Sequence, residues 1–356
     1  MVSIISNEYS ISFKEEGYLS LNNIIKENNY SKIFIIVDEN TNNHCLPKVL
    51  PMIETEVAIE IIELESGEEN KIIETCVQVW NVLIELGADR KSLVINLGGG
   101  VITDMGAFIA STFKRGISFV NIPTTLLAMV DASVGGKNGV DLGGLKNQIG
   151  TITNPGLVII DSEFLDTLPQ NQMRSGLAEM LKHGLMANKQ HWEKLKNLNI
   201  IDFADFDSLI SESISIKNTI VIEDPKEDGI RKALNFGHTL GHAIETYFLE
   251  NSDKKTLLHG EAIAAGIIME SFISLEKKLI SNKEFLEIKE TINDLFDKIE
   301  INQNEHQNII DLLIHDKKNE YGKVQFALLD GIGKIKLNQT TDNETIIKSF
   351  LNYKNY

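Results

Sequence analysis

Apolar positions in the first half of the chain fall into short continuous runs, separated by segments with helical spacing. Four runs are rich in β-branched residues and bounded by turn residues: 32–40, 91–100, 117–125 and 156–161. Such runs predict buried strands. Residues 70–87 have helical spacing and end on Gly87, which suits a left-handed helix end. Strands and helices in alternation predict a largely parallel sheet.

The pattern changes near residue 165. Beyond it, long segments with apolar spacing near 3.6 predict a mostly helical second half, with short strands at 322–329 and 333–337. We therefore expect an α/β fold with two domains: residues 1–168 as an α/β domain and residues 169–356 as a mostly helical one.

Composition limits the classes of function. Hydrophobic residues make up 42% of the 356-residue chain and charged residues 24%, as in ordinary globular enzymes. No apolar run approaches about 20 residues and the N-terminus has no secretory pattern, so we expect a cytoplasmic protein without a membrane role. The net charge of −17 argues against nucleic-acid binding. The two cysteines, Cys45 and Cys76, match no metal or redox spacing and are expected to be reduced packing residues.

Two glycine-rich segments are candidate anion sites. Residues 96–108, NLGGGVITDMGAF, follow a predicted strand and open a predicted helix, where free N–H groups favour a phosphate. The pattern is not GxGxxG, so a tight strand-to-helix turn without a nucleotide is the alternative. Residues 131–150 contain six glycines, interleaved with Asp131, Lys137, Lys146 and Asn147. We favour an anion-binding loop over a flexible surface loop here.

The segment LNFGHTLGHAIE, residues 234–245, places two histidines four residues apart. On one helix, Arg231, Asn235, His238 and His242 would share a polar face, with Gly237 and Gly241 on another. A polar stripe on an otherwise apolar helix favours a site over a core helix.

A catalytic zinc-like ion needs about three protein ligands and an open position. The histidine pair supplies one or two. Further candidates are His259, just before a predicted helix, and Glu179, with Lys182 one turn on. A surface ion pair between Glu179 and Lys182 is the alternative.

Several motifs, taken in order, resemble one family. GGGVITD, PTTLLAMVDASVGGK, LKNQIG, LAEMLKHG, LNFGHTLGHAIE and HGEA closely resemble the 3-dehydroquinate synthases, members of the sugar phosphate cyclases, from about Asp38 to Lys318. The resemblance implies a Rossmann-like parallel-sheet domain, a mostly helical C-terminal domain, and an active site in the cleft between them. It also implies a homodimer and a place in the shikimate pathway.

The resemblance also implies a site. Zinc or cobalt would be held by Glu179, His238 and His259, which leaves His242 for proton transfer with Glu227 as a second such group. NAD would be bound by Asp38, Glu68, Lys71, Gly99, Gly100, Val101, Asp104, Thr124, Thr125, Lys146, Phe164 and Thr167. Substrate would be bound by Arg115, Lys137, Asn147, Lys182, Lys217, Arg231, Asn235 and one of Lys317 and Lys318. Asp131, Lys137 and Lys182 would also take part in catalysis.

The family closes a seven-carbon keto-acid phosphate into a carbocycle with loss of phosphate and no net oxidation. Bound NAD⁺ takes a hydride and the same molecule returns it. Three alternatives remain open: another sugar phosphate cyclase of the valiolone or deoxyinosose type, a metal-dependent polyol dehydrogenase, and a non-catalytic NAD-binding protein. Arg231, Asn235 and His242 match the 3-dehydroquinate synthase set. A carboxylate-binding arginine suits an acid substrate.

Overall fold

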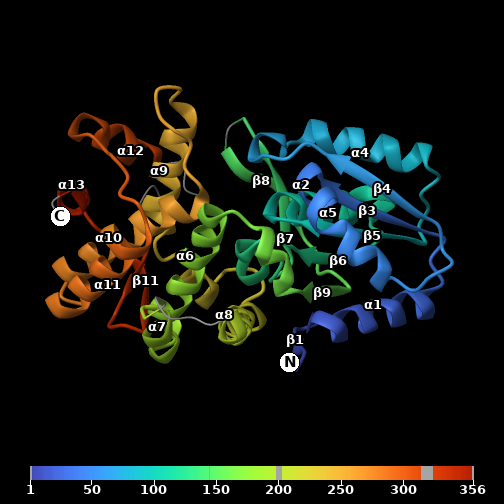
Figure 1. Cartoon of the computed structure of the whole chain (residues 1–356). Helices are drawn as coiled ribbons and strands as arrows, with labels where there is room; N and C mark the ends of the chain where they lie inside the picture. The colour runs from blue at the N-terminus through green and yellow to red at the C-terminus, as the bar shows by residue number, and fades with distance from the viewer. Residues whose placement is uncertain (1, 144, 198–202, 314–323, 355–356) are drawn as a thin grey trace. The chain divides into compact units, whose positions relative to one another are not determined.

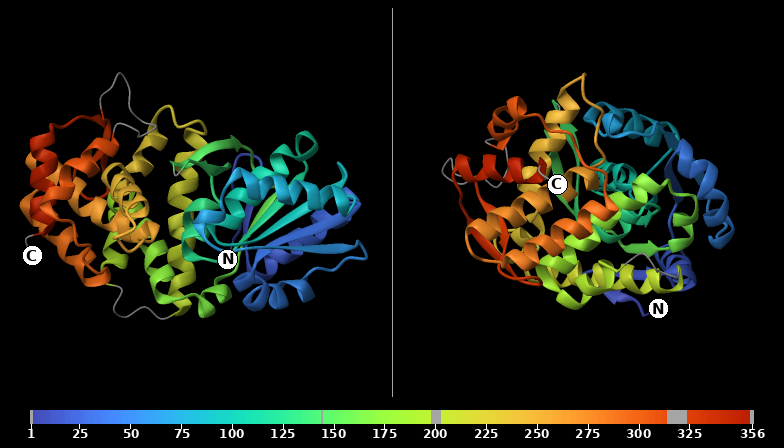
Figure 2. Two further views of the ribbon diagram at one scale, coloured as in Figure 1. Left: turned by 90° about the horizontal axis from the view of Figure 1, so that it is seen from above. Right: turned by 60° about the vertical axis from the view of Figure 1, so that its left-hand side comes forward.

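The chain folds as two units, Met1–Pro169 and Gln170–Tyr356. The structure is a computed structural model that describes residues 2–143, 145–197, 203–313 and 324–354. Figures 1 and 2 show the sheet of the first unit in blue to green and the helices of the second in yellow-green to red.

Seven strands form the sheet of the first unit, in the order β1-β2-β9-β6-β5-β3-β4 (Figure 1). Among the described residues of this sheet, every neighbouring pair from β2 to β4 is parallel, and β1 pairs with β2 in the antiparallel direction. The strands are β1 (Ile4–Ile5), β2 (Ser10–Phe13), β3 (Lys32–Asp38), β4 (Ile59–Leu64), β5 (Ser92–Gly98), β6 (Ser118–Pro123) and β9 (Leu157–Ile160). The four strands predicted from apolar runs are confirmed as β3, β5, β6 and β9. The pattern did not indicate β1, β2 or β4.

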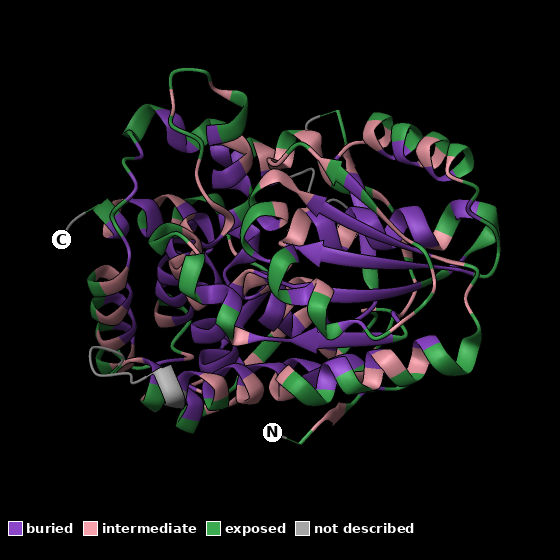
Figure 3. Cartoon of the chain, turned by 45° about the vertical axis from the view of Figure 1, so that its right-hand side comes forward, coloured by how far each residue is buried: buried purple, intermediate pink, exposed green. Residues whose placement is uncertain are grey.

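Helices cover the sheet because its strands are apolar on both faces. Every residue of β5 is buried, and Figure 3 shows the neighbouring strands in the colour of buried residues. Helices α4 (Ile73–Glu85) and α5 (Gly100–Thr112) pack on one part of the sheet through Leu83 and Phe108, which join Phe34 and Val94 in one apolar cluster. The predicted left-handed end of the 70–87 helix is confirmed at Gly87, whose φ is 78°.

Three further helices and a hairpin complete this unit. The helices are α1 (Lys14–Asn28), α2 (Glu39–His44) and α3 (Leu46–Val49). The glycine-rich segment expected as a loop is instead an antiparallel hairpin, β7 (Lys137–Leu142) with β8 (Leu145–Ile152). The loop prediction was wrong because Gly139 and Gly150 face each other across the strands. A Cβ on Gly139 would lie 2.3 Å from the carbonyl oxygen of Ile149, so these glycines serve close backbone pairing.

The second unit is mostly helical, as predicted. Its helices are α6 (Gln170–Ala187), α7 (Lys189–Leu195), α8 (Phe203–Glu223), α9 (His238–Glu250), α10 (His259–Glu276), α11 (Asn282–Leu295), α12 (His306–Leu312) and α13 (Asn343–Lys354). The two predicted C-terminal strands are confirmed as β10 (Phe326–Leu329) and β11 (Ile335–Gln339), an antiparallel pair. Helix α10 is apolar all round, and it is accordingly buried against α6, α9, α11 and α13.

Both cysteines are free and buried, as expected for packing residues. Burial raises the pKa of the Cys45 thiol to about 11 and that of Cys76 to about 12, so both stay protonated at neutral pH. Within the described ranges, no helix combines the length and apolar character needed to cross a membrane.

Candidate functional site

Three helices of the second unit meet through glycines. A Cβ on Gly260, near the start of α10, would lie 2.3 Å from the carbonyl oxygen of Ser175 in α6. A Cβ on Gly266 would lie 2.0 Å from the carbonyl oxygen of Gly237, which precedes α9. Only glycine permits these backbone approaches. The side chains at the starts of α9 and α10 are thereby brought close to α6.

Glu179 of α6 lies where these helices meet, and its side chain is fully buried. Its Oε1 lies 3.4 Å from Nε2 of His238 and 3.6 Å from Nε2 of His259. Oε2 forms an ion pair with Lys182, which is also buried. The alternative of a surface ion pair is therefore wrong. Burying these charges is costly unless each is paired, and here the carboxylate and the ammonium compensate one another.

The spacing of these atoms fits a metal ion. Ligand atoms about 2.0–2.1 Å from a tetrahedral zinc ion lie about 3.3–3.4 Å from one another. The separations of Glu179 Oε1 from the two Nε2 atoms, 3.4 and 3.6 Å, are close to that value and long for charge-assisted hydrogen bonds. One carboxylate and two imidazoles are also the donor types of catalytic zinc sites.

Both histidines have their other ring nitrogen occupied. Nδ1 of His238 lies 3.1 Å from the carbonyl oxygen of Phe236, an acceptor, so Nδ1 carries the proton and Nε2 can act as a ligand. Nδ1 of His259 lies 3.4 Å from Oε2 of Glu245. Burial alone would lower the pKa of His259, but the carboxylates of Glu245 and Glu179 raise it to about 9.

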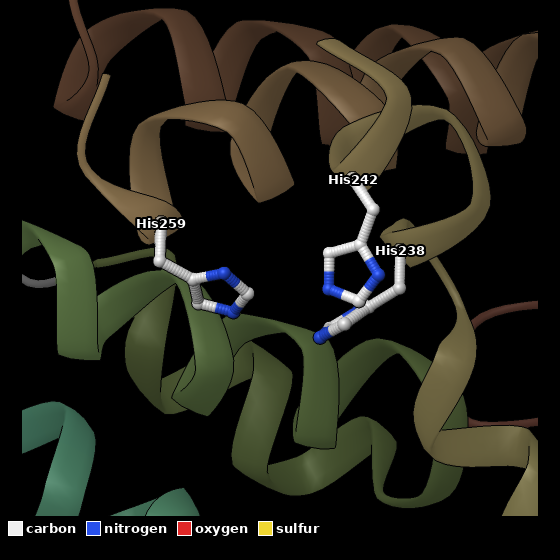
Figure 4. A group of neighbouring side chains, drawn as sticks. All are labelled: His238, His242 and His259. Atoms are coloured by element: carbon white, nitrogen blue, oxygen red, sulfur yellow. The ribbon is translucent and has the colours of Figure 1, made fainter. Parts of the chain in front are cut away.

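His242 lies one turn after His238 on α9 and belongs to the same cluster. Figure 4 shows the three imidazoles converging, two from α9 and His259 from α10. The ring centre of His242 lies 5.0 Å from that of His238 and 5.7 Å from that of His259. Nitrogens of all three rings lie within 4.8 Å of one another, so His242 is an alternative ligand on geometry alone.

The predicted single helical stripe from Arg231 to His242 is wrong. Arg231 and Asn235 belong to a separate 3₁₀ helix, Ile230–Asn235, and α9 begins at His238. Between them Gly237 has φ 78°, a left-handed conformation that ends the first helix and redirects the chain. Sequence spacing cannot detect this break because glycine is tolerated inside helices as well.

The polar residues before α9 nevertheless form contacts of their own. Asn235 Nδ2 donates to Oε1 of Glu227 at 2.7 Å. Arg231 is buried, and its guanidinium donates to the carbonyl oxygen of Pro225 at 2.8 Å. Lys217 is buried on α8. Lys317 and Lys318 lie outside the described residues.

In the first unit, the residues predicted to bind a cofactor follow the carboxyl ends of parallel strands. Asp38 ends β3, the turn from Gly99 to Val101 follows β5, Thr124 and Thr125 follow β6, and Phe164 and Thr167 follow β9. Parallel strands place these ends at one edge of the sheet. From β3 the chain continues to β4 on one side and then to β5 on the other, so the sheet has its switch point between Asp38 and the glycine turn.

The glycine turn brings α5 directly onto the sheet. Gly99 is the residue before the helix and no side chain caps the helix start. A Cβ on Gly106 would lie 2.0 Å from Oδ1 of Asn96 in β5. The amide groups of the first turn can therefore serve an anion at this edge of the sheet.

Lys71 connects helix α5 to the β7–β8 hairpin. Its buried Nζ lies 2.7 Å from Oδ2 of Asp104 and 2.8 Å from Oδ1 of Asn147. Burial alone would lower the pKa of Lys71, but the carboxylates of Asp104 and Glu68 outweigh it and raise that pKa. Lys146 lies in β8, and its Nζ is 3.3 Å from Oε1 of Glu68.

Three further residues of this unit were predicted to take part in the site, and each lies at a different place in the fold. Asp131 lies in a short π-helical segment, Ala128–Ala132, after β6, and Lys137 begins β7. Arg115 is exposed and precedes β6, at the amino end of the strands. The length of β6 separates it from the glycine turn by about 17 Å at 3.3 Å per residue. The fold of this unit thus does not bring Arg115 to the other predicted residues.

Two buried carboxylates were missed in the sequence. Glu245 lies two helical turns after His238, on the same face of α9, and this spacing could have indicated it. Glu270 of α10 accepts hydrogen bonds from the amides of Gly237 at 2.7 Å and Leu240 at 3.0 Å. No sequence signal connects Glu270 to a helix start more than thirty residues away.

Comparison with known proteins gives two family matches. Residues 61–175 match the family described as 3-dehydroquinate synthase N-terminal, and residues 176–319 match 3-dehydroquinate synthase C-terminal. A 3-dehydroquinate synthase from Parabacteroides distasonis is 41% identical over 91% of this chain and 92% of its own.

Two solved structures are similar in fold. One is a 2-deoxy-scyllo-inosose synthase complexed with carbaglucose-6-phosphate, NAD⁺ and Co²⁺, with TM-score 0.85 and 24% identity over 98% of this chain and 99% of that one. The other is a 2-epi-5-epi-valiolone synthase from Streptomyces hygroscopicus with NAD⁺ and Zn²⁺ bound, with TM-score 0.84 and 21% identity over 99% of both chains. At these identities the likeness shows the fold.

Proposed function

Because the chain belongs to the 3-dehydroquinate synthase family, we propose that it converts 3-deoxy-D-arabino-heptulosonate 7-phosphate to 3-dehydroquinate and phosphate, with NAD and one divalent metal as cofactors. The observation that carries this proposal is the group of Glu179, His238 and His259, whose spacing suits a tetrahedral ion. We further propose that the enzyme is a homodimer and acts in the cytoplasm.

In this proposal Glu179, His238 and His259 hold Zn²⁺ or Co²⁺. When bound, the metal would act as a Lewis acid on a substrate hydroxyl, and NAD⁺ would take a hydride from that carbon and return it. The hydrogen bond from His238 Nδ1 to Phe236 keeps Nε2 deprotonated for this role. Lys182 compensates Glu179 and also offers its ammonium to substrate oxygens.

His242 and Glu227 are the proposed proton-transfer groups. An imidazole titrates near neutral pH, so His242 can both accept and donate a proton during elimination and ring closure. Glu227 already accepts a hydrogen bond from Asn235, which orients its carboxylate. Asp131 is proposed to act beside the carbon that is oxidised.

The proposed substrate anions meet a set of cations. A phosphate and a carboxylate bind best to fixed, charge-assisted donors, and the buried Arg231 and Lys217 satisfy that requirement. The remaining proposed substrate residues are Lys137, Lys182, Asn147, Asn235 and one of Lys317 and Lys318. The acidic net charge is therefore compatible with an anionic substrate.

NAD is assigned to the carboxyl edge of the sheet in the first unit. The amides at the start of α5, from Gly99 to Val101, would bind its pyrophosphate, and Asp38 a ribose hydroxyl. The other proposed contacts are Glu68, Lys71, Asp104, Thr124, Thr125, Lys146, Phe164 and Thr167. Lys71 would hold Asp104 and Asn147 in place for this.

The test is phosphate release by the purified protein with NAD⁺ and Zn²⁺ or Co²⁺, with and without a chelator. We expect phosphate and 3-dehydroquinate from the seven-carbon acid phosphate, no accumulation of NADH, and loss of activity with chelator. Turnover only of a neutral heptulose phosphate would indicate another sugar phosphate cyclase. Net NADH formation with glycerol-like alcohols would indicate a polyol dehydrogenase.

A further inference from the structure

The two imidazoles proposed as ligands occupy equivalent places in the fold. His238 is the first residue of α9 and His259 is the first residue of α10. The free N–H groups of a helix start need acceptors, and these acceptors help to fix the start. The orientation of both rings therefore depends on what fixes these two starts.

Helix α10 fixes the start of α9. Glu270, fully buried in α10, accepts from the amides of Gly237 and Leu240 with its two oxygens. Gly237 itself has no side chain that could cap the helix. Because anionic oxygens at a helix start are also favoured by the helix dipole, Glu270 replaces the missing cap.

Helix α9 in turn reaches the start of α10. Glu245 lies on α9, is buried, and places Oε2 3.4 Å from Nδ1 of His259. The opposite ring nitrogen of His259 faces Glu179. The carboxylate of Glu245, the imidazole of His259 and the proposed metal position thus lie in that order.

Each helix can place a carboxylate at the start of the other only because α9 and α10 lie so close together. A Cβ on Gly241 of α9 would lie 2.8 Å from the side chain of Ile263 in α10, and Gly266 approaches Gly237 still more closely. At this separation a glutamate side chain spans from one helix to the start of the other.

We propose that Glu245 is a positioning residue of the metal site, which fixes the ring of His259 and increases the electron donation of its Nε2. Outer carboxylates of this kind orient a ligand imidazole and strengthen its bond to the metal. His238 has a neutral carbonyl in the corresponding place, that of Phe236. Of these two imidazoles, His259 is therefore the one that faces a carboxylate with its other ring nitrogen. The inference rests on the proposed function for the identity of the ligands.

The test compares the full-length protein with Glu245→Gln and a matched control, Glu250→Gln, at an exposed glutamate of the same helix. Metal affinity is measured for Zn²⁺ and Co²⁺ by competition with a chromophoric chelator, without substrate. The visible spectrum of the Co²⁺ form reports ligand geometry. NAD⁺ affinity and thermal melting establish that the rest of the fold is unchanged.

We expect Glu245→Gln to weaken metal binding about 10–100-fold and to change the Co²⁺ spectrum, with NAD⁺ affinity unchanged. Glu245→Asp, which keeps the charge, should recover part of the affinity. Glu250→Gln should behave as wild type. If Glu245→Gln binds both metals as wild type does, this inference is overturned and the proposed function stands. If the unchanged protein binds neither metal, both are overturned.

Discussion

The two units place their candidate groups by different means. In the first unit, Asp38, the glycine turn and Thr124 lie together because parallel strands end at one edge, a consequence of backbone hydrogen bonding. In the second unit, Glu179, His238 and His259 lie together because charged side chains pair inside closely packed helices. The first arrangement tolerates changes of side chain, whereas the second depends on each partner of a buried pair.

Lys71 is the exception in the first unit. It is a buried charge that joins Asp104 and Asn147, and so ties the β7–β8 hairpin to the sheet edge. The two units thus differ in how far they depend on buried charged pairs. Substitutions in each unit can measure that dependence.

The largest effect is expected at Glu179. Glu179→Ala removes a proposed metal ligand and leaves the ammonium of Lys182 buried without its carboxylate. We expect phosphate release to fall about 10³-fold, since a metal contributes several kcal/mol to the reaction. Stability should fall by about 3–5 kcal/mol in chemical denaturation. Glu276→Ala, at an exposed position of α10, is the control. Unchanged metal content in the Glu179 variant would contradict the assignment.

The next effect separates the two histidines of α9. His242→Ala should lower the rate about 10²-fold while metal content persists, because a proton-transfer group contributes about that factor. His238→Ala should lose the metal. Metal analysis after dialysis and single-turnover rates measure both. The opposite pattern would exchange their roles, with His242 as the ligand and His238 as the proton-transfer group.

A smaller effect tests backbone placement in the first unit. Gly106→Ala puts a methyl group 2.0 Å from Oδ1 of the buried Asn96, so either this amide, which donates to Asn121, or helix α5 must shift. We expect a loss of about 1–3 kcal/mol in unfolding free energy and weaker NAD⁺ binding. The control is Gly156→Ala, whose Cβ would have its nearest neighbour at an ordinary 3.6 Å. Equal stability of the two variants would show that the close contact of α5 is dispensable.

The smallest effect concerns a buried histidine outside the site. His306 stacks on Phe350 at 4.7 Å between ring centres, and burial together with Lys354 lowers its pKa below 6.5. As pH falls, the unfolded chain therefore binds a proton before the folded chain does. The stability contribution is complete above about pH 6.5 and is lost as pH falls through the folded-state pKa.

His306→Phe should remove this dependence, so the difference in unfolding free energy from wild type should move in favour of the variant between about pH 7 and pH 5. Urea unfolding at several pH values measures it. His44→Phe, at an exposed histidine, should leave the difference constant. A constant difference for His306→Phe as well would show that its burial does not affect titration.

Local patterns predicted much of the fold. Apolar β-branched runs indicated β3, β5, β6 and β9, and Gly87 indicated the end of α4. These features depend on neighbouring residues, so a single sequence contains them. The edge strand β4 was missed because Glu60 and Glu63 interrupt its apolar pattern.

Predictions were wrong where a glycine had two possible uses. Gly237 interrupts a helix that spacing made continuous, and Gly139 and Gly150 pair strands in a segment expected to be a loop. Whether a glycine turns the chain, lets two backbones approach or does neither depends on what packs against it. Sequence spacing does not contain that information.

The sequence by itself determined the alternation of four buried strands with helices, the mostly helical second half, the residue types available for chemistry and the family resemblance, because these depend on local pattern and motif order. Only the tertiary structure decided that Glu179 and Lys182 form a buried pair, that Glu245 faces His259 and that Glu270 caps α9. Such pairings join residues distant in the chain, and their stabilisation depends on burial, which exists only once the helices have packed.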